Sequence, residues 1–127
     1  MAFFKQKQKN GIFILSLASS DRSKSVVTAK ADADTPYESG TILVDITAAG
    51  ADKGKFIRAS EATSEQIAAI TRAAVLRDRT FAETDTSVLV IERDAELTER
   101  LTDIDDLAAG TKTAVLAKLT ALGVVLR

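Results

Sequence analysis

The apolar residues of this chain fall in short runs that are separated by residues which favour turns. The clearest run is VLVIER, at Val88–Arg93, where β-branched and other apolar residues follow one another over the length of one strand. Runs of about four to eight such residues between turn-forming residues are typical of β-strands. None approaches the roughly 20 apolar residues that a membrane-spanning helix needs. The spacing therefore predicts a fold built from short strands.

The segment TILVDITAAGADKGKFIRAS, Thr41–Ser60, predicts a β-hairpin. Its first half alternates apolar residues with others, which is the period of a strand with one apolar face. Gly50 and Gly54 bracket the loop, where glycine allows the positive φ angles that tight turns need. Phe56 and Ile57 then begin the returning strand.

Two helices are predicted between the strands. Thr63 is placed to cap the first helix, with Gln66 three residues later as its partner in a capping box. The second helix begins at Thr111 and ends before Gly123, a residue type that suits the position just after a helix. Its apolar residues recur at helical spacing: Val115, Leu119 and Leu122.

Three further segments complete the pattern. A strand is predicted around Val75 and Leu76, a helical turn capped by Asp94 in DAELTERL, and a final strand at Val124–Arg127. Strands with short helices between them are typical of a compact α+β domain. A chain of 127 residues is most simply one such domain. We therefore expect a small β-rich α+β domain with short helices.

The composition argues against an enzyme. The chain contains no cysteine and no histidine. These absences exclude disulfides, thiolate catalysis and zinc–thiolate sites, and they remove the commonest general base near neutral pH. We expect no cofactor, and we find no phosphate-binding glycine loop and no nucleophile with a base beside it.

Three polar features remain as candidate sites, and each has a simpler interpretation. The Asp103, Asp105 and Asp106 cluster lacks the spacing of a calcium loop and suits the dipole of the helix that follows. Asp52 and Lys53 lie at the hairpin tip, as the modified lysine of a lipoyl carrier domain does, but the two symmetry-related sheets of such a carrier are lacking. The third feature is a possible phosphate-binding stripe of Arg72, Arg77 and Arg79, in which Asp78 intervenes.

Charge is unevenly distributed along the chain. Residues 1–30 hold six basic residues and one acidic residue, whereas the remainder holds eleven basic and seventeen acidic residues. A basic start on an acidic body suggests a segment that docks on something else, although a solvated terminus has the same composition. The acidic body and the poor aromatic content argue against direct nucleic-acid binding.

The first twenty residues, MAFFKQKQKNGIFILSLASS, have two interpretations. Lysines followed by an apolar run and small residues are the order found in a cleaved secretory signal. The alternative is an extended arm with a strand that pairs with the edge of a sheet, on its own domain or on another protein. Under that hypothesis we expect removal of residues 1–20 to abolish binding and to leave the body folded.

Several phrases, taken in order, resemble the lambda-type head decoration proteins of tailed bacteriophages. These are SGTILVDIT, GKFIRAS, AAVLRD, DTSVLVIERDAELTERL and the final AKLTALGVVLR. The resemblance covers about four-fifths of the chain, from Val26 to Arg127. Such proteins are non-enzymatic and cofactor-free, and they have a β-tulip-like fold. They bind the outside of an expanded capsid, commonly as trimers at threefold positions, and stabilise the shell against the pressure of packaged DNA.

The resemblance implies an N-terminal arm at residues 1–25 that contacts the major capsid protein and a single decoration domain at residues 26–127. It also implies a homotrimer on the virion surface, assembled in the host cytoplasm, with no nucleic acid or membrane as partner. A secreted β-rich binding module with a cleaved signal is the alternative. The predicted capsid-binding residues of the arm are Phe3, Phe4, Ile12, Phe13, Ile14, Leu15 and Leu17.

Overall fold

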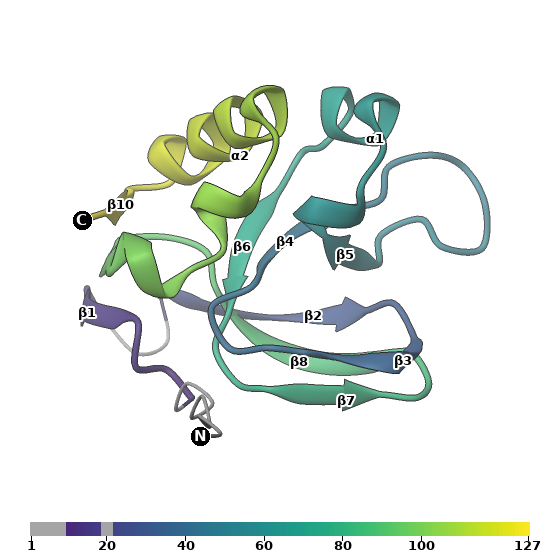
Figure 1. Cartoon of the computed structure of the whole chain (residues 1–127), viewed down its shortest axis with the longest axis horizontal. Helices are drawn as coiled ribbons and strands as arrows, with labels where there is room; N and C mark the ends of the chain where they lie inside the picture. The colour runs from purple at the N-terminus through teal and green to yellow at the C-terminus, as the bar shows by residue number, and fades with distance from the viewer. Residues whose placement is uncertain (1–9, 19–21) are drawn as a thin grey trace, which may run out of the picture.

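The computed structural model describes residues 10–18 and 22–127. This part of the chain forms a small β-rich domain, as the sequence predicted, and it contains ten strands and two α-helices (Figure 1). The helices are α1 (Ser64–Ala68) and α2 (Ala109–Ala121). The strands are β1 (Ile14–Leu17), β2 (Lys24–Ala29), β3 (Asp32–Tyr37), β4 (Ile42–Asp45), β5 (Phe56–Arg58), β6 (Ala73–Leu76), β7 (Thr80–Ala82), β8 (Thr86–Ile91), β9 (Ala95–Leu97) and β10 (Val124–Leu126).

Five strands close into a barrel in the order β2-β5-β4-β6-β8. β4 and β5 are antiparallel, with Leu43 opposite Arg58 and Asp45 opposite Phe56, so the predicted hairpin is confirmed. The pairs β4–β6, β6–β8 and β2–β8 are also antiparallel. A short parallel contact between β2 and β5, at Ala29 and Phe56, closes the barrel.

Two smaller sheets flank the barrel. β9 is the central strand of the order β1-β9-β10, antiparallel to β1 and parallel to β10. β3 and β7 form an antiparallel two-stranded sheet beside β2 and β8 (Figure 1). Helices α1 and α2 lie together on the opposite side of the barrel from the sheet formed by β3 and β7 (Figure 1).

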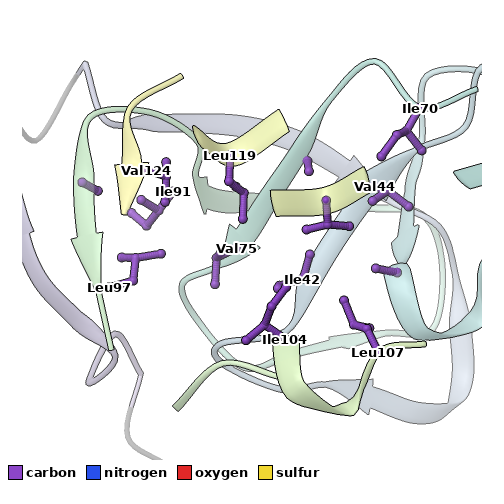
Figure 2. Packing of buried hydrophobic residues seen from close by; sticks show 14 of the residues in the cluster. Ile42, Val44, Ile70, Val75, Ile91, Leu97, Ile104, Leu107, Leu119 and Val124 are labelled. Carbon is purple, nitrogen blue, oxygen red and sulfur yellow. The ribbon is translucent and has the colours of Figure 1, made fainter. Parts of the chain in front are cut away.

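The hydrophobic residues form two cores on opposite faces of the barrel wall. One core takes residues from all five barrel strands, among them Leu43, Leu76 and Val90, and is the barrel interior. The other lies outside the wall, where Ile42, Val44, Val75, Ile104 and Leu119 meet (Figure 2). Because successive residues of a strand point to opposite faces, β4 contributes to both cores and is buried along its whole length. The hairpin was expected to have only one firmly apolar face.

Helix α1 is capped as the sequence predicted. The Gln66 N–H donates to Thr63 Oγ1, and the Thr63 N–H donates to Gln66 Oε1. This reciprocal pair satisfies two of the N–H groups that a helix start leaves without partners.

Helix α2 begins two residues earlier than predicted, at Ala109, after an Ala108 cap that provides no side-chain acceptor. Val115 and Leu119 are buried against the outer core, as their spacing indicated. Leu122 is the C-terminal capping residue and is exposed, so its place on the buried face was wrong. Gly123 follows with φ +81°, as expected of a residue that ends a helix in the left-handed conformation.

The predicted helical turn after Asp94 is wrong. Residues Ala95–Leu97 form β9, and only Glu99–Leu101 beyond it are helical, as a single 3-10 turn. β9 hydrogen-bonds to β1 on one side and to β10 on the other. Local preference for a helix is weak here, and pairing with two strands from the ends of the chain outweighs it.

Candidate binding surface on strand β1

The residues predicted to form a free arm include a strand of the domain itself. Phe13–Ala18 runs along β9, with Ile14 opposite Leu97 and Leu17 opposite Ala95. The Thr98 N–H donates to the Phe13 carbonyl at 2.7 Å, and the Ala18 N–H donates to the Asp94 carbonyl at 2.9 Å. Among the described residues β1 has a neighbour only on the side of β9, so it is one of the two edge strands of this sheet, with β10 as the other.

Side chains of this segment divide between the core and the surface. Phe13 is fully buried in the outer core, and Ile14 and Leu17 pack partly against it. Ile12 and Leu15 point outward, with 50% and 54% of their surface exposed. Of the predicted binding residues in the described part of the chain, only Ile12 and Leu15 present substantial apolar surface to a partner.

Phe13 cannot contact a partner while β1 is docked, so the structure does not bring all the predicted residues together on one surface. Phe3 and Phe4 lie outside the described residues. The predicted boundary between an arm at residues 1–25 and a domain at residues 26–127 falls within β2 (Lys24–Ala29). β1 ends at Leu17, and β2 begins at Lys24.

The predicted polar sites have structural roles in the described part of the chain. Asp103 Oδ1 accepts from the Ile42 N–H at 2.8 Å and so ties a 3-10 turn (Ile104–Asp106) to β4. Burial, with a smaller contribution from the like charge of Asp106, raises the pKa of Asp103 to about 6. Asp105 pairs with Lys112 of α2. Within residues 10–18 and 22–127, no three His, Cys, Asp or Glu side chains gather as a metal site would require.

The hairpin tip is fixed by ion pairs. Asp52 contacts both Lys30 and Lys55, each at 3.1 Å, and Lys55 also contacts Asp85 at 2.6 Å. Hydrogen bonds from Lys55 and Lys30 hold the pKa of Asp52 below its usual range. These contacts join the hairpin loop to the connection between β2 and β3 and to the turn between β7 and β8. Lys53 is the exposed neighbour of this cluster.

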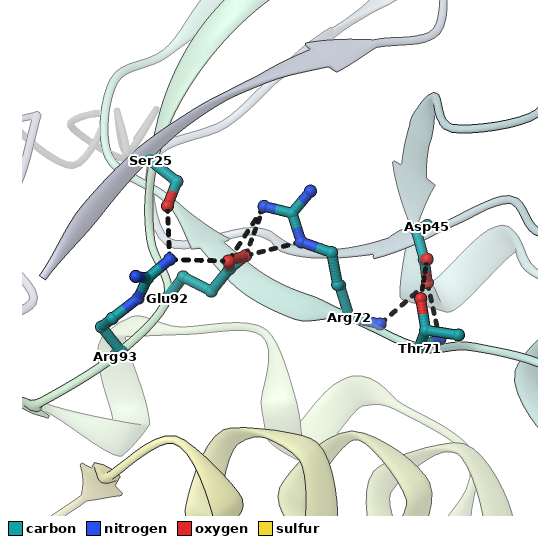
Figure 3. Close-up of polar contacts among 6 residues, drawn as sticks. All are labelled: Ser25, Asp45, Thr71, Arg72, Glu92 and Arg93. Atoms are coloured by element: carbon teal, nitrogen blue, oxygen red, sulfur yellow. Dashed lines mark hydrogen bonds and ion pairs between the residues drawn. The ribbon is translucent and has the colours of Figure 1, made fainter.

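The three arginines do not form a stripe. Arg72 makes a bidentate ion pair with Glu92, which is 3% exposed, and Arg93 reaches the same carboxylate from the other side (Figure 3). Arg79 pairs instead with Glu38, and its guanidinium lies 4.7 Å from the ring centroid of Phe81. Arg77 precedes Asp78 outside any strand.

No pattern in the sequence indicated the buried charges that join the strands. Arg58 is 8% exposed, donates to the carbonyls of Thr35 and Pro36, pairs with Asp32 and stacks on Tyr37 at 4.0 Å. Asp45 accepts from the N–H groups of Thr71 and Arg72. Both residues lie on strands at alternating positions, where a charge is ordinarily interpreted as solvent-facing.

One hollow of about 400 Å³ lies between α1 and α2. It is lined by small and apolar side chains and contains no acid or base: Ser64, Ile67, Ala68, Ala108, Gly110, Thr111 and Ala114. No described helix is long and apolar enough to cross a membrane. The lining of the hollow between α1 and α2 therefore supplies no group for acid–base chemistry.

Comparisons with family models, with curated proteins and with solved structures find no match for this chain.

Proposed function

We propose that this chain is a capsid decoration protein with a β-tulip-like fold. It binds the outer surface of an expanded bacteriophage shell, as trimers at threefold positions, and stabilises the shell without catalysis. The observation that carries the proposal is the edge strand β1 together with the turn before it, where Leu15 and Ile12 respectively face solvent. An exposed strand edge with apolar side chains is a ready template for pairing with another chain.

Because β1 is already docked on the body, binding to a capsid requires less ordering of this segment than a free arm would. An arm that orders only on contact loses conformational entropy, about 1–2 kcal/mol for each residue fixed. Here residues Asn10–Ala18 are already hydrogen-bonded to the body, so this part of the cost is met during folding. Burial of Ile12 and Leu15 on a partner would then contribute directly, at most about 1.5–3 kcal/mol for each side chain. Modest affinity per copy suffices where many copies bind one shell and the subunits of a trimer bind together.

The alternative is a secreted binding module whose first twenty residues are removed. Cleavage there would take away β1 and Phe13, which is fully buried in the outer core. The cavity left by a lost aromatic side chain costs about 3–5 kcal/mol. This consideration favours the decoration proposal, because under that proposal the segment stays with the protein.

Co-sedimentation with expanded, undecorated capsids from the producing phage tests the proposal, measured as copies bound per shell. We expect saturation near one copy for each major capsid subunit. Leu15→Ser should weaken binding, whereas the matched control Val26→Ser should not, because Val26 is 69% exposed but lies on β2 of the barrel. Failure of the folded wild-type protein to bind any such shell would refute the function. If neither Leu15→Ser nor Ile12→Ser changes binding, the proposed role of this surface is refuted, but the decoration function is not.

A further inference from the structure

The dipeptide Asn10-Gly11 is chemically reactive, and Asn10 is the only asparagine in the chain. In an Asn-Gly sequence the glycine nitrogen can attack the asparagine Cγ. An N–Cγ bond forms, the bond from Cγ to the side-chain nitrogen breaks and ammonia leaves, which produces a cyclic succinimide. Water then opens either carbonyl of the ring and yields aspartate or isoaspartate. Glycine as the second residue favours the reaction because it has no Cβ to hinder the approach.

In the folded protein the attacking nitrogen is held by other partners. The Gly11 N–H donates to the Arg77 carbonyl at 3.0 Å and to Ser39 Oγ at 3.2 Å. Attack requires this nitrogen to lose its proton and to face the asparagine Cγ, so both hydrogen bonds must first break. Gly11 also has φ +70°, a left-handed conformation that these contacts keep in place.

The group under attack is held as well. Asn10 Oδ1 accepts from the Arg79 N–H at 2.8 Å. The side chain is therefore fixed by the residue after Asp78, while the Gly11 nitrogen is fixed by Arg77 and Ser39. The attacking nitrogen and the side chain under attack are therefore both hydrogen-bonded to residues 77–79 of the body. Phe13, two residues after Gly11, anchors the same segment in the outer core.

We propose that Asn10-Gly11 is a site of spontaneous succinimide formation that the docking of β1 protects. The reaction proceeds when the N-terminal end of this segment leaves Arg77 and Ser39. It is irreversible once ammonia is lost, so the modified fraction is a covalent record of how often the segment has opened. This inference depends on the contacts of β1 and is independent of the proposed function.

The products act on the same contacts. Aspartate adds a negative charge to a body that already carries more acidic than basic residues. Isoaspartate inserts one extra carbon atom into the backbone before Gly11. That insertion displaces the Gly11 N–H from the Arg77 carbonyl and from Ser39 Oγ. Isoaspartate formation should therefore loosen β1 further.

Intact mass spectrometry during incubation at mildly alkaline pH tests the proposal, because Asn10 is the only asparagine and glutamine side chains lose ammonia much more slowly. We expect conversion in the folded protein to be slower than in the urea-unfolded chain by about tenfold or more, as for other reactions that need local opening. Ser39→Ala, which removes one of the two acceptors of the Gly11 N–H, should speed conversion in the folded protein. Asn10→Gln is the control and should show no such change over the same period.

Equal rates in the folded and unfolded wild-type protein would overturn the proposal. An unchanged rate in folded Ser39→Ala would overturn the assignment of protection to the Ser39 contact. If Ser39→Ala does not fold, the conversion rates of folded and unfolded wild-type protein still test whether the fold protects Asn10. Hydrogen exchange at the Thr98 N–H, which donates to the Phe13 carbonyl, provides a second measurement. Exchange there should be faster in isoaspartate-containing protein than in fresh protein.

Discussion

Asp94 and Gly123 face each other in left-handed backbone conformations, with φ +48° and +81° respectively. A Cβ added to Gly123 would lie 2.6 Å from Asp94 Oδ1. The Asp94 N–H donates to the Leu122 carbonyl, and the Asp94 carbonyl accepts from Ala18 and from the Ser23 hydroxyl. This one residue therefore joins the end of β1, the approach to β2, the start of β9 and the turn between α2 and β10.

Gly123→Ala should destabilise the domain by about 1–3 kcal/mol, because the new Cβ requires both a strained φ and a shift of Asp94. Urea unfolding measures the change. Gly110→Ala is the matched control, since Gly110 lies in α2 with nothing within 4 Å of an added Cβ. That substitution should stabilise the protein by about 0.5–1 kcal/mol, because alanine favours a helix over glycine. Equal effects of the two substitutions would contradict this account of Gly123.

Phe13→Ala should cost about 3–5 kcal/mol of unfolding free energy, the usual range for a buried aromatic residue. Removal of residues 1–9 should leave the unfolding free energy close to that of the full chain, whereas removal of residues 1–18 should lower it sharply. This expectation replaces the one from the sequence, in which the body stays folded without residues 1–20. The unfolding free energies of the two truncated proteins decide between these two expectations. Equal values would show that β1 does not contribute to the fold.

Arg72→Ala should destabilise the fold more than Arg127→Ala. Loss of Arg72 leaves Glu92 buried with only Arg93 as a charged partner, at 3.4 Å. Breaking a buried pair costs about 3–5 kcal/mol, and the partial exposure of Arg72 reduces our expectation to about 1–3 kcal/mol. The pair between Arg127 and Glu96 is largely exposed and should contribute about 0–1 kcal/mol. Thermal unfolding of the two variants tests the order, and the reverse order would refute it.

Asp103→Asn should stabilise the protein near neutral pH. Burial raises the pKa of Asp103 from 3.8 to about 6, so the folded state binds this proton more tightly than the unfolded state. The associated stability is fully present below pH 3.8 and is lost as pH rises through about 6. Asparagine removes the charge and can still accept from the Ile42 N–H. We expect a gain of about 1–2 kcal/mol at pH 7, after allowance for partial exposure.

The difference between wild type and Asp103→Asn should be plotted against pH, because other carboxylates titrate with the opposite sign. The pKa values of Asp32, Asp52 and Asp85 are lowered by their ion pairs, so their contributions disappear on acidification. Subtraction removes these shared contributions. A difference that stays constant between pH 4 and pH 7 would contradict the assignment.

Several local features of the fold were predictable from the sequence alone. The β4–β5 hairpin, the Thr63–Gln66 capping box, Gly123 after α2 and the final strand each depend on residues close together in the chain. Periodicity, capping and the φ preference of glycine act over a few residues, so the sequence displays them directly.

The tertiary structure alone decided where β1 lies and what the charged residues do. Phe13 and Leu15 are similar apolar residues two positions apart, yet one is in the core and the other faces solvent. A register irregularity between Ile14 and Ser16 accompanies this division. Asp94 resembled a helix cap but joins four elements. Glu92 is the buried partner of Arg72, and Arg58 is the buried partner of Asp32. Each outcome depends on strands from distant parts of the chain, whose hydrogen bonds and packing outweigh local preference.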